Sequence, residues 1–203
     1  MWIIKIGGSW IDKVELNELI TNLSKYSQLE NIIIVVGGGC FADAVRLVYA
    51  SNQMSEKTGH FLALKGTEMF AYIIKEINKR ISLINNIESL KVIDRKLKVW
   101  MPSIVLKDEP SFINSWESTS DSVAAWLHTK LKSNGLVFVK SLIFKKKIYK
   151  LKHLQDKNVL DKNVGKYLCT QKNIKIVGPE IIDLLRNAKD WKKFYYDLNE
   201  VQL

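Results

Sequence analysis

The stretch that decides the fold is Trp2-Ile3-Ile4-Lys5-Ile6-Gly7-Gly8-Ser9, an apolar strand pattern that ends in two glycines. A second stretch repeats this arrangement, because Ile32 to Val36 runs into a triple glycine. Glycine has no side chain, so the backbone N–H groups of such loops can come close to a phosphate. The two loops predict phosphate binding, with these candidate contacts: Gly7, Gly8, Ser9, Gly37, Gly38 and Gly39.

Lys5 lies in the middle of the first apolar run, between Ile4 and Ile6. A lysine in a strand that is buried on both faces needs an anionic partner, because an unpaired buried charge is costly. We expect its ammonium group to reach phosphate oxygens and to stabilise the charge on a phosphoryl group during transfer. The alternative is a lysine on an edge strand, with its ammonium group extended into solvent.

The apolar patterns predict an α/β fold. The second strand has no polar face, which is typical of a parallel sheet covered by helices on both sides. Further helices are predicted over residues 16–23, 40–50, 55–84 (one helix or two), 120–131, 161–168 and 179–187. Further strands are predicted over residues 91–93, 97–106, 136–140 and 174–177, with a basic hairpin over 143–151.

The composition suits one ordinary domain spanning residues 1–203, because 47% of the residues are hydrophobic and 26% are charged. The sequence has neither an apolar run long enough to cross a bilayer nor a signal-type start, so we expect a cytoplasmic protein. Cys40 and Cys169 are the only cysteines and form no CxxC pair. We expect both thiols to be reduced and mostly buried, with neither a disulfide nor a zinc site.

The chain carries a formal net charge of +10, with a dense run of lysines between Lys140 and Lys152. Such charge attracts nucleotides, phosphorylated metabolites and nucleic acids alike. The lysine run is either a solvated hairpin or a specific anion site. No recognisable nucleic-acid motif accompanies the charge, so nucleic acid is not an expected partner.

Two common nucleotide-binding motifs are absent from the glycine loops. Neither loop matches GxxxxGK followed by Ser or Thr, and neither matches GxGxxG. The sequence therefore favours phosphate binding on a scaffold other than the P-loop or the Rossmann fold.

A polar segment, Ser115 to Ser122, precedes an apolar helix pattern. One interpretation is a helix cap, in which Thr119, Ser120 or Asp121 satisfies free N–H groups. The other is functional, because an acidic residue at the mouth of a parallel sheet could orient Lys5 and Lys140 or help to hold a metal ion. Lys140 follows a strand, and open α/β sheets bind their ligands at the carboxyl ends of strands, which makes Lys140 a candidate nucleotide contact.

Together, the Lys5 to Ser9 stretch, the triple glycine and the segment Thr119 to Ala125 resemble the amino acid kinase superfamily. This resemblance implies an αβα sandwich around a mainly parallel sheet, and an ATP-dependent phosphotransferase (kinase) that uses ATP and Mg²⁺. It also implies that Lys5 contacts the transferring phosphoryl group, that the glycine loops cradle phosphates and that Asp121 organises the catalytic lysines. A homodimer is an expectation by the same analogy.

A narrower resemblance rests on Thr58 to Leu64 and on Ser115 to Trp126. These segments look like the branch that contains aminomethylfuranmethanol phosphate kinase of methanofuran biosynthesis. The resemblance implies that the acceptor is a small phosphorylated metabolite, a phosphomonoester. His60 and Lys13 become candidates for holding the acceptor phosphate, with Thr119 and Ser120 as further substrate contacts.

Several alternatives stay open beside this resemblance. His60 could be a surface histidine on a helix, and Lys13 could be a solvated lysine. The family's Gly-Gly-Met segment with a following lysine is not evident in the second half of this chain. The alternative function is therefore a catalytically reduced member of the fold that binds a nucleotide or metabolite in a regulatory role.

Overall fold

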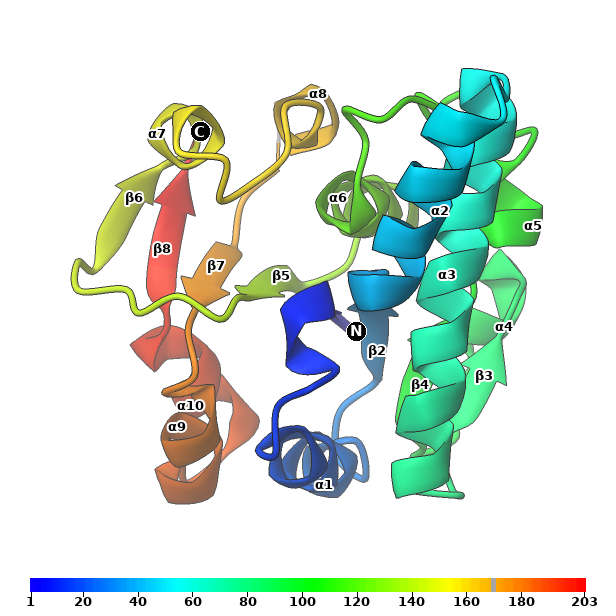
Figure 1. The fold of residues 1–203 in the computed structure, drawn as a ribbon. Helices are drawn as coiled ribbons and strands as arrows, with labels where there is room; N and C mark the ends of the chain where they lie inside the picture. The colour runs from blue at the N-terminus through cyan, green and yellow to red at the C-terminus, as the bar shows by residue number, and fades with distance from the viewer. Residues whose placement is uncertain (169–170) are drawn as a thin grey trace.

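In the computed structural model, which describes residues 1–168 and 171–203, eight strands form one sheet in the order β3-β4-β2-β1-β5-β7-β8-β6 (Figure 1). All neighbouring pairs are parallel except β7 and β8, which pair antiparallel. The strands are β1 (Trp2–Ile6), β2 (Ile32–Val36), β3 (Ser82–Ile84), β4 (Lys98–Trp100), β5 (Gly135–Val139), β6 (Ile148–Lys150), β7 (Ile174–Val177) and β8 (Asn199–Gln202).

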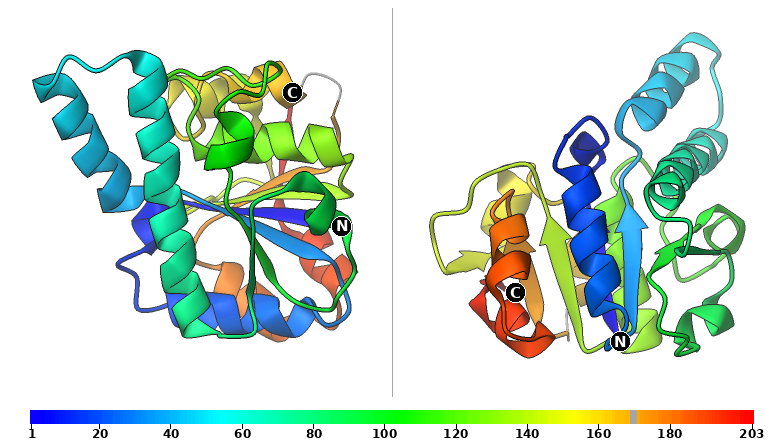
Figure 2. Two further views of the ribbon diagram at one scale, coloured as in Figure 1. Left: turned by 90° about the vertical axis from the view of Figure 1, so that its right-hand side faces the viewer. Right: turned by 90° about the horizontal axis from the view of Figure 1, so that it is seen from below.

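Helices cover both faces of the sheet, so the predicted αβα architecture is confirmed (Figures 1 and 2). A short 3-10 helix, η1 (Gly8–Trp10), follows β1. The α-helices are α1 (Leu16–Tyr26), α2 (Gly39–Ser51), α3 (Glu56–Ile77), α4 (Ile87–Lys91), α5 (Ser103–Leu106), α6 (Ser120–Leu131), α7 (Leu151–Asp156), α8 (Val164–Leu168), α9 (Ile181–Asn187) and α10 (Trp191–Asp197).

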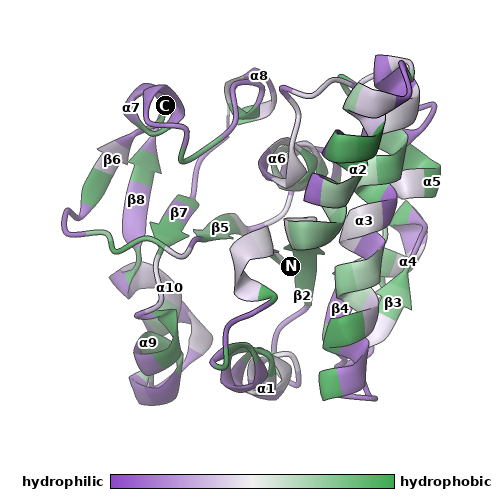
Figure 3. Ribbon diagram, viewed as in Figure 1, coloured by the Kyte–Doolittle hydropathy of each residue, from purple (hydrophilic) through white to green (hydrophobic). Residues whose placement is uncertain are grey.

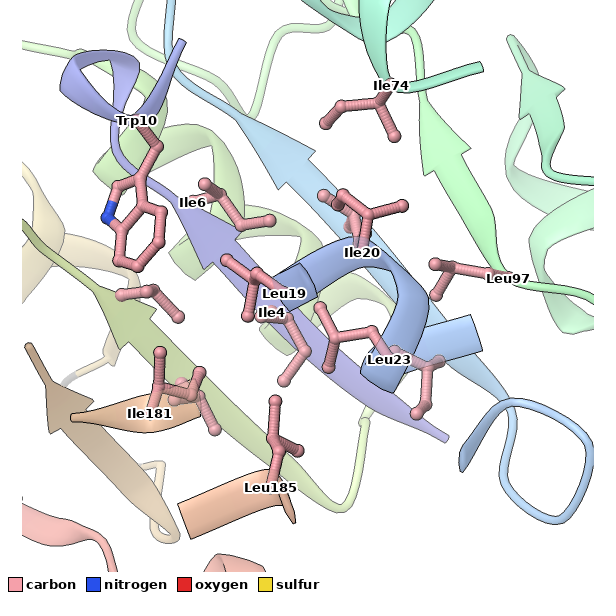
Figure 4. Packing of buried hydrophobic residues seen from close by; sticks show 14 of the residues in the cluster. Ile4, Ile6, Trp10, Leu19, Ile20, Leu23, Ile74, Leu97, Ile181 and Leu185 are labelled. Atoms are coloured by element: carbon pink, nitrogen blue, oxygen red, sulfur yellow. The ribbon is translucent and has the colours of Figure 1, made fainter. Parts of the chain in front are cut away.

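The side chains of β1 alternate between two hydrophobic cores. Ile4 and Ile6 pack with α1, α9 and α10 on one face (Figure 4), whereas Ile3 belongs to the core under α6 and α8 on the other. Strand periodicity turns Lys5 to the same face as Ile3. Because β1 pairs with β2 on one side and β5 on the other, Lys5 is central, and the edge-strand interpretation is wrong.

The two helices after the triple glycine, α2 and α3, lie side by side at one border of the molecule (Figure 2, left). Figure 3 shows the contrast between them and the sheet: β2 is hydrophobic throughout, whereas α2 and α3 mix hydrophobic and hydrophilic residues. Only Ala42 of α2 is buried. Cys40 is exposed on the first turn of α2, so its predicted burial is wrong, and Cys169 lies outside the described residues.

Several predicted elements differ from the structure. Residues 91–93 are not a strand, because Lys91 ends α4 and residues 92–93 follow it. The 97–106 stretch divides into β4 and α5 because Pro102 cannot donate to a sheet. The basic hairpin is also wrong, since β6 pairs in parallel with β8 near the end of the chain. The predicted helix over 55–84 stops at Ile77 and is followed by β3. Within the described residues, no helix has the length and hydropathy that a bilayer crossing requires.

Candidate active site

A buried lysine and a mostly buried one meet a buried aspartate at the carboxyl end of the central strands. Lys5 Nζ lies 2.7 Å from Asp121 Oδ1, and Lys140 Nζ lies 2.7 Å from Asp121 Oδ2. Lys5 and Asp121 are buried, and the Lys140 side chain is 14% exposed. The structure thus brings the predicted residues Lys5, Asp121 and Lys140 together.

Three different elements place these groups. Lys5 is on β1, Lys140 follows β5, and Asp121 lies in the first turn of α6, which packs across the sheet. The parallel pairing of β1 with β5 puts Ile6 beside Val139, so the loops after both strands leave the sheet at the same point. The cluster therefore forms where open α/β sheets place their ligands.

Burial and charge act in opposite directions on this cluster. Burial alone would raise the pKa of Asp121, but the ammonium groups of Lys140 and Lys5 outweigh it and hold the pKa below its ordinary value. Burial lowers the pKa of Lys140 to about 8, although the charge of Asp121 opposes this shift. Two lysines share one carboxylate, so the cluster with both lysines protonated carries an excess positive charge that suits an anionic ligand.

A second carboxylate, the partly buried Asp161, holds the start of α6 in place. Asp161 Oδ2 accepts hydrogen bonds from the backbone N–H groups of Thr119 (2.8 Å) and Ser122 (2.9 Å), and from the Thr119 hydroxyl (2.8 Å). Its Oδ1 accepts the N–H groups of Asn163 and Val164, both at 3.1 Å, at the start of α8. Asp161 thereby connects α8 to the turn that carries Asp121, and we did not predict this residue from the sequence.

The two glycine loops pack backbone against backbone. A Cβ atom on Gly8 would lie 2.3 Å from the Gly39 nitrogen, and one on Gly37 would lie 2.4 Å from the Gly8 nitrogen. Gly39 also has a φ of +50°, which disfavours any residue with a side chain. Glycine is therefore required by contact at Gly8 and Gly37, and by both contact and conformation at Gly39.

The predicted phosphate contacts divide into two groups. The N–H groups of Gly7 and Gly37 are used inside the sheet, donating to Val139 O (2.9 Å) and Ile6 O (2.8 Å). In the part of the chain that the structure describes, the N–H groups of Gly8, Ser9, Gly38 and Gly39 donate no hydrogen bond. These four groups are the ones available to an anion.

A cavity of about 140 Å³ opens beside these free N–H groups. The predicted residues Thr119 and Ser120 line it from the start of α6, and Thr119 is also the cap of that helix, its hydroxyl accepting from the Asp121 N–H at 3.3 Å. Both interpretations of the polar segment are thus compatible with the structure. The residues lining the cavity are Gly8, Gly37, Gly38, Gly39, Ala42, Asp43, Arg46, His60, Ala63, Leu64, Thr67, Trp116, Ser118, Thr119 and Ser120.

His60 lines the cavity from α3 and is buried, so the surface interpretation is wrong. Its Nε2 lies 3.0 Å from the Ser118 carbonyl oxygen, to which it must donate. Burial lowers the pKa of His60, which favours the neutral ring at pH 7. His60 therefore fixes the segment before α6, and the nitrogen that donates is already engaged.

Two other predicted residues lie apart from the cavity. Lys13 is exposed in the turn after η1 and is not among the residues that line the cavity. The Ser9 hydroxyl donates to Ser141 Oγ at 3.0 Å, which links the first glycine loop to the segment after β5. Most of the lysine run is exposed, and only Lys140 enters the buried cluster.

The described residues offer no carboxylate cage for a metal ion. Within residues 1–168 and 171–203, no group of three or more His, Cys, Asp or Glu side chains could hold one. Both oxygens of Asp121 already accept hydrogen bonds from lysines. Mg²⁺ in kinases is held largely by substrate phosphates and water, with one or two carboxylates, so we assign no side chain to it.

The sheet, the free N–H groups and the lysine–aspartate cluster define an α/β protein with a site that suits an anionic ligand. Residues 1–142 match the model of the amino acid kinase family, and the chain belongs to this family. The predicted recognition is confirmed.

One curated relative is (5-(aminomethyl)furan-3-yl)methyl phosphate kinase from Methanocaldococcus jannaschii, which is 30% identical over 131 residues. The match covers 63% of this chain and 59% of the relative, so the chain spans less than two thirds of the relative's length. The narrower resemblance seen in the sequence thus has a curated counterpart.

Solved structures of kinases share the fold. Uridylate kinase from Archaeoglobus fulgidus superposes with a TM-score of 0.71 at 14% identity, covering 92% of this chain and 95% of that chain. UMP kinase from Ureaplasma parvum gives 0.69 at 13% identity, covering 93% and 95%. Aspartate kinase from Synechocystis gives 0.67 at 12% identity, covering 87% of this chain and 37% of that chain.

Proposed function

We propose that this chain is an ATP-dependent kinase that transfers the γ-phosphoryl group to a small phosphomonoester. The observation that carries the proposal is the Lys5–Asp121–Lys140 cluster beside the free N–H groups of two glycine loops. Membership of the amino acid kinase family supports phosphotransfer as the reaction, with ATP as the donor and Mg²⁺ accompanying it. The cavity beside the loops provides room for a small acceptor.

The proposed mechanism relies on positioning and charge. Lys5 stabilises the negative charge on the phosphoryl group in transfer, and Lys140 neutralises the nucleotide phosphates at the end of β5. Asp121 keeps both ammonium groups aimed at one point, since it contacts each of them within 3 Å. The N–H groups of Gly8, Ser9, Gly38 and Gly39 bind the remaining phosphate oxygens.

A phosphomonoester acceptor suits this site because its reacting oxygen needs no general base. The second ionisation of a phosphomonoester has a pKa of about 6, so the oxygen is largely charged at neutral pH. His60, whose pKa is lowered by burial and whose Nε2 is bound to Ser118, then has a positioning role. The relative's name places its own acceptor in this chemical class, and we propose the same acceptor, or a close analogue, for this chain.

The replacement Lys5→Met tests the proposal. It replaces the ammonium group with an apolar side chain of similar length and leaves Asp121 paired with Lys140. We expect the rate of ADP release in the presence of the acceptor to fall by roughly a thousandfold, since one such charge contact typically contributes a factor of this order. A wild-type rate in a folded Lys5→Met protein would refute the mechanism.

Lys98→Met is the matched control. Lys98 is also a buried lysine in a strand, but it lies at the amino end of β4, where its Nζ is 3.1 Å from Asn31 Oδ1. We expect this variant to lose stability while the catalytic rate constant of the folded fraction is unchanged. Comparison of the two variants therefore separates the loss of the catalytic charge from the loss of stability that follows removal of any buried lysine.

A further inference from the structure

We propose that Asp43 and Trp116 form a subsite for a positively charged group at the far end of the acceptor. Arg46 occupies this subsite when no acceptor is bound. The inference rests on the proposed function for the identity of the ligand. It adds the residues that receive the ammonium group of that acceptor.

The position of the subsite follows from the course of α2. This helix starts at Gly39, beside the free N–H groups, and extends away from the sheet. Asp43 lies four residues further, about 6 Å along the helix axis. Asp43 and Arg46 line the same cavity as the glycine loops. A small ring with one substituent on each side can therefore reach from the loops to Asp43.

Trp116 forms the other wall and is fixed from several sides. Its backbone N–H donates to Glu56 Oε1 at 3.0 Å, and its ring meets the edge of Tyr49 with centroids 5.0 Å apart. Gly59 allows the approach, because a Cβ atom there would lie 2.7 Å from Trp116 Cζ2. The ring is thus held in place before a ligand arrives, which lowers the entropic cost of binding.

A cation already lies between these two walls. The Arg46 guanidinium carbon is 5.7 Å from the centroid of the Trp116 ring, and Arg46 Nη1 is 2.5 Å from Asp43 Oδ1. An aromatic face beside a carboxylate is a general receptor for ammonium groups. The Arg46 and Asp43 side chains are 50% and 69% exposed, so their ion pair is weak and can be exchanged for a ligand's charge.

Binding of a matched pair of compounds tests the subsite. The probes are (5-(aminomethyl)furan-3-yl)methyl phosphate and its analogue with a methyl group in place of the aminomethyl group. Calorimetry with the wild-type chain should show tighter binding of the amine. Asp43→Asn should weaken binding of the amine roughly tenfold and leave binding of the methyl analogue unchanged, because only the amine carries a positive charge that can pair with Asp43.

Asp183→Asn is the control, since Asp183 forms the same kind of pair with Arg186 three residues later, on α9 and away from the cavity. It should alter binding of neither compound. Arg46→Gln should leave binding of the methyl analogue unchanged and should not weaken binding of the amine.

Equal affinity of the wild-type chain for the two compounds would overturn the inference, as would an Asp43→Asn effect on both. Weaker binding of both compounds to Arg46→Gln would also overturn it, because Arg46 would then be holding the phosphate. Turnover is measured separately. A chain that binds the amine selectively but releases no ADP would support the subsite and contradict the proposed kinase activity.

Discussion

At the scale of single residues, the site consists of two ammonium groups held beside the single buried carboxylate of Asp121. Lys5 lies on β1 and Lys140 directly follows the neighbouring strand β5, so the two ammonium groups would repel each other without Asp121 between them. Removing one partner of a buried ion pair leaves the other charge uncompensated, which destabilises a protein more than replacing both partners with apolar residues. The three residues should therefore behave as a unit in both stability and catalysis.

Asp121→Asn should destabilise the fold by about 3 kcal/mol, because it leaves two buried ammonium groups without their carboxylate. It should also reduce the catalytic rate constant, since the lysines lose the group that aims them. Urea denaturation measures the first effect, and a steady-state assay on the folded protein measures the second. An unchanged denaturation midpoint would show that Asp121 does not stabilise the two lysines.

The pH dependence of kcat/KM for ATP should report Lys140. Burial lowers the pKa of this lysine to about 8 in the free protein, so raising the pH through that value removes its proton and its positive charge. We expect kcat/KM to decline above about pH 8, because this ratio reports the ionisations of the free enzyme.

Lys140→Arg provides the control for this profile, since a guanidinium keeps its charge at any pH used. The decline should move to higher pH in the variant, whatever its absolute rate. A decline at the same pH in both proteins would assign the ionisation to another group.

The residues of the cluster could be predicted from the sequence, because Lys5 interrupts an apolar strand and Asp121 begins a helix after a polar segment. The contact of Asp161 with α6 could not, since it acts across about 40 residues of chain. Its hydrogen bonds to Asn163 and Val164 at the start of α8 are local and indicate only a helix start. Arg46 and Trp116 were missed for a similar reason: an arginine on a helix and a tryptophan in a loop become significant only when α2, α3 and the segment before α6 are packed together.

At the scale of elements, the two glycine loops pack into one unit, which we propose as the phosphate cradle. Gly8 and Gly39 come from different loops, yet their backbones are in contact. The directions of the free N–H groups therefore depend on the packing of these two backbones. The start of α6 is fixed independently, by Asp161 from one side and His60 from the other.

Gly8→Ala should separate the loops, because its Cβ atom would lie 2.3 Å from the Gly39 nitrogen and backbone cannot move aside cheaply. We expect kcat/KM for ATP to fall by roughly a hundredfold, a typical effect of a displacement of about 1 Å at a reacting centre. Gly165→Ala is the control, since its Cβ atom meets nothing closer than 3.5 Å. Similar kinetics for both variants would contradict the cradle.

The strands and helices that the sequence predicted well are those whose pattern reflects their own burial. β2 and β5 are continuous apolar runs, β1 and β7 are apolar runs with one lysine each, and α6 follows a clear cap. The sequence did not predict α10 and β8, nor the pairing of β6. The hydrogen bonds of β6 are to β8, which lies about 50 residues later, so its local sequence suggested a hairpin instead.

At the scale of the whole molecule, the last third of the chain completes the fold on which the site stands. The family match ends at residue 142, but β7, α9 and α10 follow it and contribute Val177, Ile181, Leu185, Trp191 and Phe194 to one of the two cores. Trp191 and Tyr195 also pack against Trp2 on β1, the strand that carries Lys5.

A chain ending at residue 142 should therefore show no cooperative thermal transition, because one face of β1 and the outer side of β5 lose their cover. Circular dichroism on heating measures this. Removal of Leu203 alone, which is 54% exposed, should leave the transition unchanged. A cooperative transition at the wild-type temperature in the shortened chain would mean that the matched segment folds independently.

The central claim is that this site moves the γ-phosphoryl group of ATP onto a phosphomonoester. The most direct measurement is phosphorus NMR of the wild-type chain with ATP, Mg²⁺ and (5-(aminomethyl)furan-3-yl)methyl phosphate. We predict that the ATP signals are replaced by those of ADP and of a new diphosphate ester in equal amounts. ATP that stays intact, or that yields only inorganic phosphate beside an unchanged phosphomonoester, would contradict the claim.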